Sequence, residues 1–145
     1  PQRPQGRPSD PPTPLVGAPA QAQAPAVALV TVGLGDDGRL VSALADLGFE
    51  GAVIAAMGAG HVPRTMAEPL GALARRMPVV LSTRVAGGPV FSRTYGFPGS
   101  EMDLLARGLI HGGALGALKA RLLLQLGLAA GMAAPELAAL FDRFR

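Results

Sequence analysis

The 145-residue sequence has no cysteine, no tryptophan and only one tyrosine. Without cysteine the chain can form neither a disulfide nor a thiolate nucleophile, and its redox compartment stays undetermined. Charged residues make up only 16% of the chain. No apolar run reaches the ~20 residues that a membrane-spanning helix needs. We therefore expect a protein that does not cross a membrane.

A basic surface of the kind that binds nucleic acid is also lacking. The formal net charge is only +3. Nearly all the basic residues are arginines, scattered along the chain rather than gathered into a stripe with aromatic residues. This pattern disfavours nucleic acid as a partner.

The sequence offers no recognisable metal or cofactor motif. His61 and His111 are far apart, and neither has a histidine or acidic residue three or four positions away, as a zinc motif would need. The step Gly-Ala-Gly at residues 58–60 follows an apolar run, as a dinucleotide fingerprint does. However, Pro63 stands where the third glycine is needed. We therefore expect no metal and no cofactor.

A catalytic set is equally hard to find. The serines and threonines show no nucleophile-elbow spacing, and a hydroxyl nucleophile needs a base within reach. Asp36 and Asp37 follow an apolar run, as in a phospho-receiver, but later strand ends supply no partner lysine. The only lysine, Lys119, is interpreted as a helix-surface charge. The sequence predicts no catalytic residue in this chain.

The chain divides into two parts of different composition. Residues 1–26 hold more than half of the 14 prolines and almost no large apolar side chain, which predicts a disordered Pro/Ala/Gln-rich linker. This segment lacks the charged start and apolar core of a signal peptide. Because Pro1 rather than Met begins the chain, we expect a piece of a longer protein. Residues 27–145 are long enough for one domain.

That domain alternates runs typical of strands and helices. Strands are expected at residues 27–32, 52–56 and 78–82 and near Leu109 and Ile110, and helices at 40–47, 70–76 and 115–128 and after Pro135. Asp36 or Asp37 is expected to cap the first helix, and Pro69 to start or kink the second. The order predicts a three-layer α/β domain with a small, mostly parallel sheet of the Rossmann or flavodoxin-like class.

Two polar residues, His61 and Glu101, stand in expected loops beyond buried strands. In open parallel α/β sheets, ligands bind outside the carboxyl ends of the strands, so these residues are the candidate ligand-facing groups. Alternatives remain open for both. His61 could cap the next helix or bond the loop backbone, and Glu101 could be a solvated loop charge.

Five runs taken together carry a family resemblance. They are GFEGAVI at residues 48–54, MGAGHVP at 57–63, VVLSTR at 79–84, GLI at 108–110 and LKARLLL at 118–124. In this order the chain resembles the C-terminal domain of the bacterial L-asparaginase family across nearly all of residues 27–144. The resemblance implies an amidohydrolase that converts L-asparagine to L-aspartate and ammonia through an acyl-threonine intermediate.

The resemblance also implies how the work is divided. In that family the catalytic threonines, aspartate and lysine belong to a larger N-terminal domain, whose motifs are absent here. The C-terminal domain lends a glutamate and an asparagine to a neighbouring subunit, and these positions fall on Glu101 and His61. We therefore expect L-asparagine or a related amide as the substrate, the N-terminal domain as a partner and a dimer or tetramer in the cytoplasm. The alternative is a non-catalytic α/β module that binds an amino acid or a partner chain.

Overall fold

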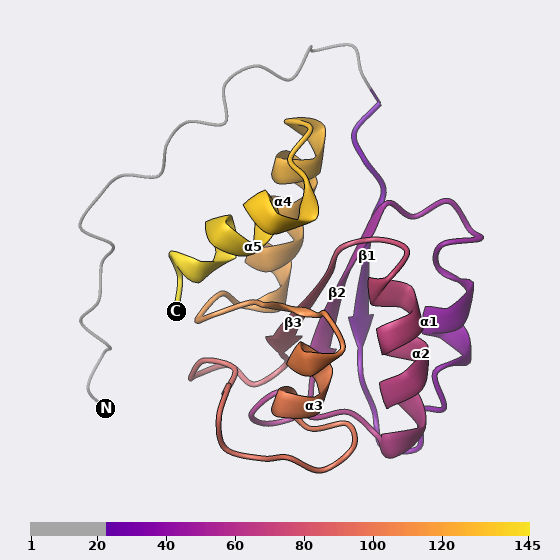
Figure 1. The fold of residues 1–145 in the computed structure, drawn as a ribbon, viewed down its shortest axis with the longest axis vertical. Helices are drawn as coiled ribbons and strands as arrows, with labels where there is room; N and C mark the ends of the chain where they lie inside the picture. The colour runs from indigo at the N-terminus through magenta and orange to yellow at the C-terminus, as the bar shows by residue number, and fades with distance from the viewer. Residues whose placement is uncertain (1–22) are drawn as a thin grey trace.

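The computed structural model describes residues 23–145, which form a parallel sheet covered by helices on both faces (Figure 1). The strands are β1 (Val27–Thr31), β2 (Gly51–Ala56), β3 (Val79–Thr83) and β4 (Ile110–His111), side by side in chain order. All the pairings are parallel, so the carboxyl ends meet at one edge of the sheet. The predicted α/β class is confirmed.

Helices form the two outer layers. They are α1 (Arg39–Ala43), α2 (Arg64–Ala74), α3 (Glu101–Ala106), α4 (Ala117–Ala129) and α5 (Ala134–Asp142). Strands that follow one another in the same direction with right-handed crossovers place their connecting helices on one face. The first three helices accordingly share a face, while α4 and α5 cover the other (Figure 1).

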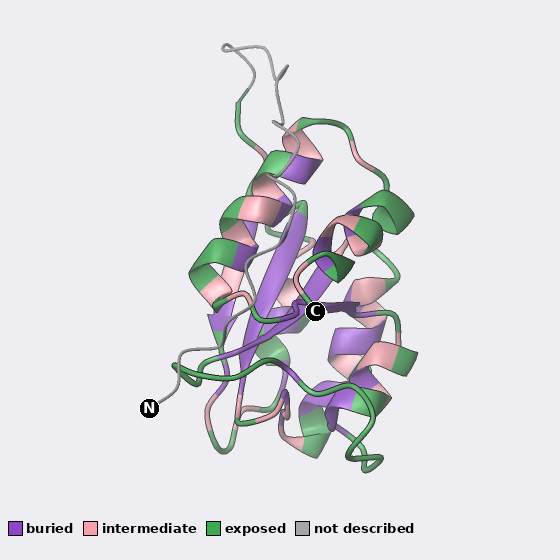
Figure 2. Cartoon of the chain, turned by 90° about the vertical axis from the view of Figure 1, so that its left-hand side faces the viewer, coloured by how far each residue is buried: buried purple, intermediate pink, exposed green. Residues whose placement is uncertain are grey.

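The core consists of two apolar clusters separated by the sheet. The strands between them are mostly buried (Figure 2). Side chains alternate between the two clusters along each strand, as the period of two requires. In β2, Ile54 packs with α1, α2 and α3, whereas Val53 packs against α4 and α5. All six residues of β2 are buried, which explains the continuous apolar run that predicted a strand covered on both faces.

Helix α3 differs from the sequence-based prediction, and the expected position of Glu101 in a loop is wrong. Glu101 is the first residue of α3, and Ser100 is its N-cap. The Ser100 hydroxyl accepts a hydrogen bond from the Asp103 N–H at 3.5 Å, and the Asp103 carboxylate accepts one from the Gly99 N–H at 2.8 Å. This is a Ser-x-x-Asp capping pattern, so the signal for the helix stood in the sequence.

Two smaller predictions also need correction. The N-cap of α1 is Gly38 rather than an aspartate, although Asp37 accepts a hydrogen bond at 3.1 Å from the backbone N–H of Arg39, the first residue of the helix. Asp36 accepts from the Gly33 N–H instead. Pro69 lies inside α2 instead of starting it. Its ring fills the space beside Gly38, where a Cβ would come within 2.8 Å of the proline Cγ. Pro69 therefore packs closely against Gly38, the N-cap of α1.

The predicted linker lies mostly outside the described residues, which start at residue 23. Where the chain enters the domain it is hydrogen bonded: the Ala26 N–H donates to Glu50, and the Pro25 carbonyl accepts from Gln125. Over residues 23–145 the structure has no helix that is both long and apolar enough to span a bilayer.

Candidate functional site

A tight turn follows β2 and carries His61 at the carboxyl edge of the sheet. The turn is closed by two backbone hydrogen bonds between Met57 and His61, each 2.8 Å long. Gly60 adopts a φ of +113°, which favours glycine. A Cβ at Gly60 would lie 2.8 Å from Val90 Cγ1 and 3.4 Å from Glu101 Cβ. The missing side chain lets the turn approach the start of α3.

A second glycine completes this approach. Gly99 has a φ of +89°, and its carbonyl accepts a hydrogen bond from the Val62 N–H at 2.9 Å. A Cβ at Gly99 would lie only 2.6 Å from the Val62 carbonyl oxygen. The turn after β2 is thus joined directly to the residue before the N-cap of α3. His61 and Glu101, 40 positions apart in sequence, become neighbours.

The Glu101 carboxylate is fully buried and hydrogen bonded at both oxygens. Oε1 accepts from the backbone N–H of Thr94 at 2.9 Å and of Tyr95 at 2.7 Å, and Oε2 lies 3.3 Å from His61 Nε2. Burial raises the pKa of Glu101, but the N–H groups of Tyr95, Thr94 and Glu101 itself, with His61, outweigh burial and hold the pKa below its ordinary value. A buried negative charge therefore stands behind His61 at neutral pH.

The ring of His61 lies between two aromatic rings. Its centroid is 4.9 Å from that of Tyr95, with the planes at 89°, and 5.1 Å from that of Phe97, with the planes at 64°. The side chain of His61 is 23% exposed, so it is the accessible member of the pair with Glu101. The N-cap of α2 is Pro63, with no side-chain cap, so His61 does not cap that helix.

The sequence predicted His61 and Glu101 as site residues but did not predict Tyr95 and Phe97. Both belong to the long segment of residues 84–100, which follows β3. A signal was present, because three of the six aromatic residues, Phe91, Tyr95 and Phe97, fall in this segment, and all three are exposed. Exposed aromatic side chains in a glycine-rich loop are typical of binding surfaces.

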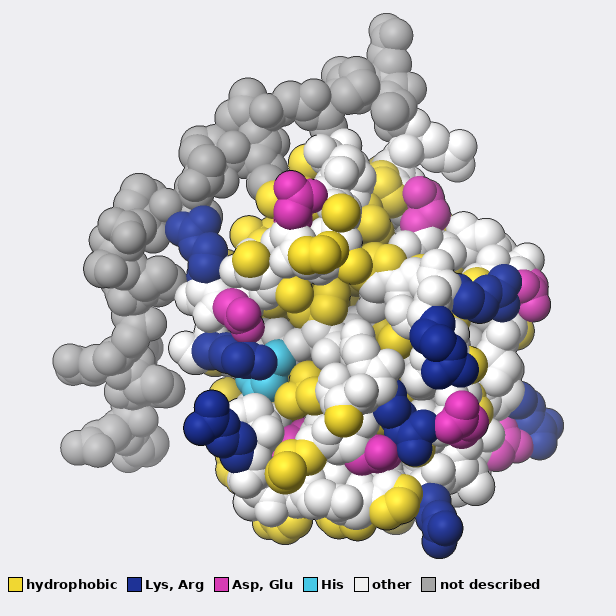
Figure 3. Space-filling view, viewed as in Figure 1, with side chains coloured by type: hydrophobic (Ala, Val, Ile, Leu, Met, Phe, Trp, Pro, Cys, Tyr) yellow, Lys and Arg dark blue, Asp and Glu magenta, His cyan; other side chains and the backbone are white. Residues whose placement is uncertain are grey.

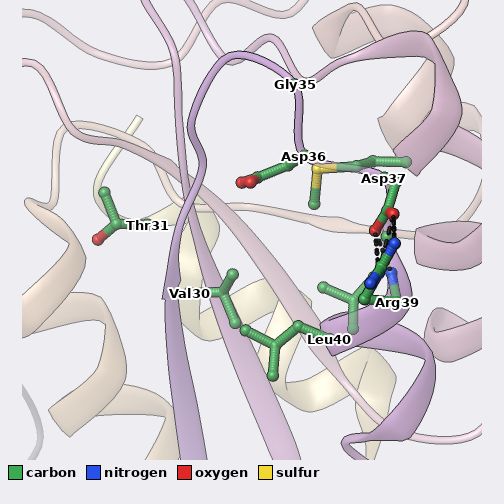
Figure 4. A pocket seen from close by; sticks show the side chains of 10 residues that line it. Val30, Thr31, Gly35, Asp36, Asp37, Arg39 and Leu40 are labelled. Carbon is green, nitrogen blue, oxygen red and sulfur yellow. Dashed lines mark hydrogen bonds and ion pairs between the residues drawn. The ribbon is translucent and has the colours of Figure 1, made fainter.

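A separate open pocket of about 450 Å³ lies beside the carboxyl end of β1 (Figure 4). Its lining includes Val30, Asp36, Arg39, Leu40 and Met66. Asp36 already accepts a hydrogen bond from the Gly33 N–H, and Asp37 accepts one from the Arg39 side chain. None of the residues of the His61–Glu101 site lines this pocket.

Several other polar groups of the described residues have structural partners. The hydroxyls of Ser82, Thr83 and Ser100 donate to backbone carbonyls, at 3.0, 2.6 and 2.6 Å, rather than to a base. His111 Nδ1 accepts from the Gly113 N–H at 2.9 Å and takes no part in the site. Between residues 23 and 145 no three His, Cys, Asp or Glu side chains are grouped to hold a metal ion.

Comparisons with known proteins agree with one another. Residues 26–141 match the family described as the glutaminase/asparaginase C-terminal domain. An L-asparaginase of Bacillus licheniformis is 36% identical over 110 residues, which cover 75% of this chain and 34% of that protein. A probable L-asparaginase of Deinococcus radiodurans is 37% identical over 94 residues, covering 65% of this chain and 28% of that protein. The chain spans about a third of the length of these curated relatives.

Proposed function

The chain belongs to the glutaminase/asparaginase C-terminal domain family, and from that premise we propose that it supplies substrate-positioning residues to an L-asparaginase-type amidohydrolase. The residues proposed for this role are His61 and Glu101. The observation that carries the proposal is their pairing at the carboxyl edge of the sheet, with the carboxylate buried and the imidazole partly exposed. This edge is where ligands bind in open α/β sheets.

The chemistry of the pair suits the amino-acid end of asparagine. An ionised carboxylate attracts an α-ammonium group and forms charge-assisted hydrogen bonds with it. The three recorded contacts of Glu101 use three of the roughly four acceptor positions of a carboxylate. His61 offers a ring nitrogen that donates or accepts according to its protonation. Glu101 thus provides charge, and His61 provides the accessible contact.

The reacting groups would come from another domain. In the described residues, the recorded hydroxyl donors bond to the backbone, which fits a chain that holds no nucleophile. The family resemblance supports a model in which the catalytic threonines belong to an N-terminal domain and the site is shared between neighbouring subunits. We therefore propose a dimer or tetramer of the full-length protein, located in the cytoplasm, with the acyl-threonine formed on the N-terminal domain.

Substitution of Glu101 in the full-length protein tests the proposal. Glu101→Gln keeps the shape of the side chain and removes its charge, so kcat/KM for L-asparagine should fall about tenfold, mainly through KM. His61→Asn should have a milder effect, because the amide still offers a hydrogen-bond donor and an acceptor. Steady-state kinetics of ammonia release, measured from acidic to mildly basic pH, gives both results.

Glu68→Gln is the matched control. Glu68 lies on the exposed surface of α2, where it pairs with Arg107, so its loss should leave kcat/KM unchanged. If Glu101→Gln behaves like this control while the protein stays folded, Glu101 has no role in binding the substrate.

A second candidate function is that of a small module that binds an amino acid without catalysis. The pocket beside β1 favours it, because carboxylate and guanidinium groups stand there next to apolar side chains (Figure 4). This hypothesis predicts that Asp36→Asn, and not His61→Asn, weakens the binding of L-asparagine to the chain. NMR titration of the chain with L-asparagine measures the binding. The opposite order supports the site at His61.

A further inference from the structure

We infer that Tyr95 and Phe97 are positioning residues that fix the imidazole of His61 for its contact with the substrate, an inference that rests on the proposed function. Neither ring is a core element, because Tyr95 is 42% exposed and Phe97 47% exposed. Each nevertheless meets the His61 ring edge-on at about 5 Å, within the 4.5–7 Å range of favourable aromatic pairs.

The rings are placed by the backbone that carries them. Ser100 and Glu101, at the start of α3, bind this backbone at four points. Glu101 Oε1 accepts from the Thr94 and Tyr95 N–H groups. The Ser100 hydroxyl donates to the Tyr95 carbonyl at 2.6 Å, and the Ser100 N–H donates to the Phe97 carbonyl at 2.9 Å. The two aromatic residues are therefore fixed relative to α3.

His61 is fixed relative to the same helix. Its backbone closes the turn after β2, and the Val62 N–H donates to the Gly99 carbonyl. Its Nε2 lies 3.3 Å from Glu101 Oε2, which limits rotation of the ring about the side-chain bonds. The rings of Tyr95 and Phe97, whose centroids are 6.1 Å apart, further limit the movement of the His61 ring. One carboxylate thus orients the imidazole directly, through Oε2, and indirectly, through the Oε1 bonds that hold Tyr95.

This arrangement assigns different tasks to the aromatic residues. A ring that contacts His61 without bonding the substrate affects how often the imidazole has its binding orientation. Loss of such a ring raises KM and leaves the chemical step unaltered. Phe91 lies in the same segment and is 43% exposed, but it is not among the aromatic pairs with His61. It provides a matched control.

The first arm of the test is NMR of this chain without substrate. The ring protons of His61, identified through His61→Asn, should shift in Tyr95→Leu and in Phe97→Leu, because each change removes a neighbouring ring current. They should stay in place in Phe91→Leu, and Tyr95→Phe should restore the wild-type position. If Tyr95→Leu and Phe97→Leu shift His61 no more than Phe91→Leu does, the inference is overturned.

The second arm is kinetics of the full-length protein. Phe97→Leu and Tyr95→Leu should raise KM for L-asparagine about threefold each with kcat little changed, and Tyr95→Phe should retain the wild-type KM. An unchanged KM in both, while His61→Ala raises KM, overturns the positioning role and leaves the proposed function intact. If His61→Ala itself leaves kcat/KM unchanged, the proposed role of His61 fails, and the inference fails with it.

Discussion

At the scale of single residues, the two histidines illustrate how environment sets their tasks. His61 is partly exposed beside a carboxylate, whereas His111 is buried in β4. Burial and the nearby positive charge of Arg145 lower the pKa of His111, against the opposing effects of the Val90 and Phe91 backbone and of Asp142. Nδ1 accepts from the Gly113 N–H, which requires a ring without a proton on that atom. His111 is thus a neutral structural residue.

This environment predicts a dependence of stability on pH. Because the folded pKa of His111 lies below the unfolded value of about 6.5, the unfolded chain takes up the proton first as pH falls. The stabilisation is complete above about pH 6.5 and decreases below it. His111→Gln, which keeps an acceptor for Gly113, should remove the decrease below about pH 6.5. Urea unfolding across this range measures it, and an unchanged slope in His111→Gln would contradict the assignment.

At the scale of elements, the site depends on how closely the turn after β2 approaches the start of α3. Parallel strands bring their carboxyl ends together, so the sequence alone could place His61 and Glu101 at one edge of the sheet. It could not supply the burial of Glu101 or the ring contacts of Tyr95 and Phe97. The burial and the ring contacts depend on the path of residues 84–100. Long-range contacts determine this path, and local sequence periodicity does not predict it.

Two glycines in this region give a matched test of the approach. Gly60→Ala places a Cβ at positive φ and against Val90, so it should lower the free energy of unfolding by about 1–3 kcal/mol. Gly87→Ala meets nothing within 4 Å and has no positive φ, so it should be neutral or stabilise by about 0.4–1 kcal/mol. Chemical denaturation compares the two. Equal stabilities would show that the turn is not tightly packed against α3.

At the scale of the whole molecule, α4 presents an apolar surface. Leu118, Leu122 and Leu126 stand one turn apart on this helix and are 75%, 57% and 42% exposed. Hydrophobic side chains also gather in the region that α4 and α5 occupy (Figure 3). The opposite side of α4 packs on the sheet through Ala120 and Leu124. Exposed apolar side chains gathered in one stripe of a helix are typical of an interaction surface.

We therefore expect the chain to self-associate when it is studied without the N-terminal domain proposed as its partner. Replacing Leu118, Leu122 and Leu126 together by Gln should lower the average mass in light scattering. Leu34→Gln is the control, because Leu34 is 89% exposed but lies in the loop after β1. Addition of the N-terminal domain should also relieve self-association. A wild-type chain that remains monomeric at high concentration would contradict this expectation.

Ammonia release from L-asparagine, measured for this chain alone and joined to the asparaginase N-terminal domain proposed as its partner, decides whether the chain acts through substrate positioning. The chain alone should release no ammonia above background, because the hydroxyls of Ser82, Thr83 and Ser100 donate to backbone carbonyls rather than to a base. The joined protein should release ammonia, and Glu101→Gln should lower the rate of this release. Release by the purified chain alone, rising in proportion to its purity, would contradict the account.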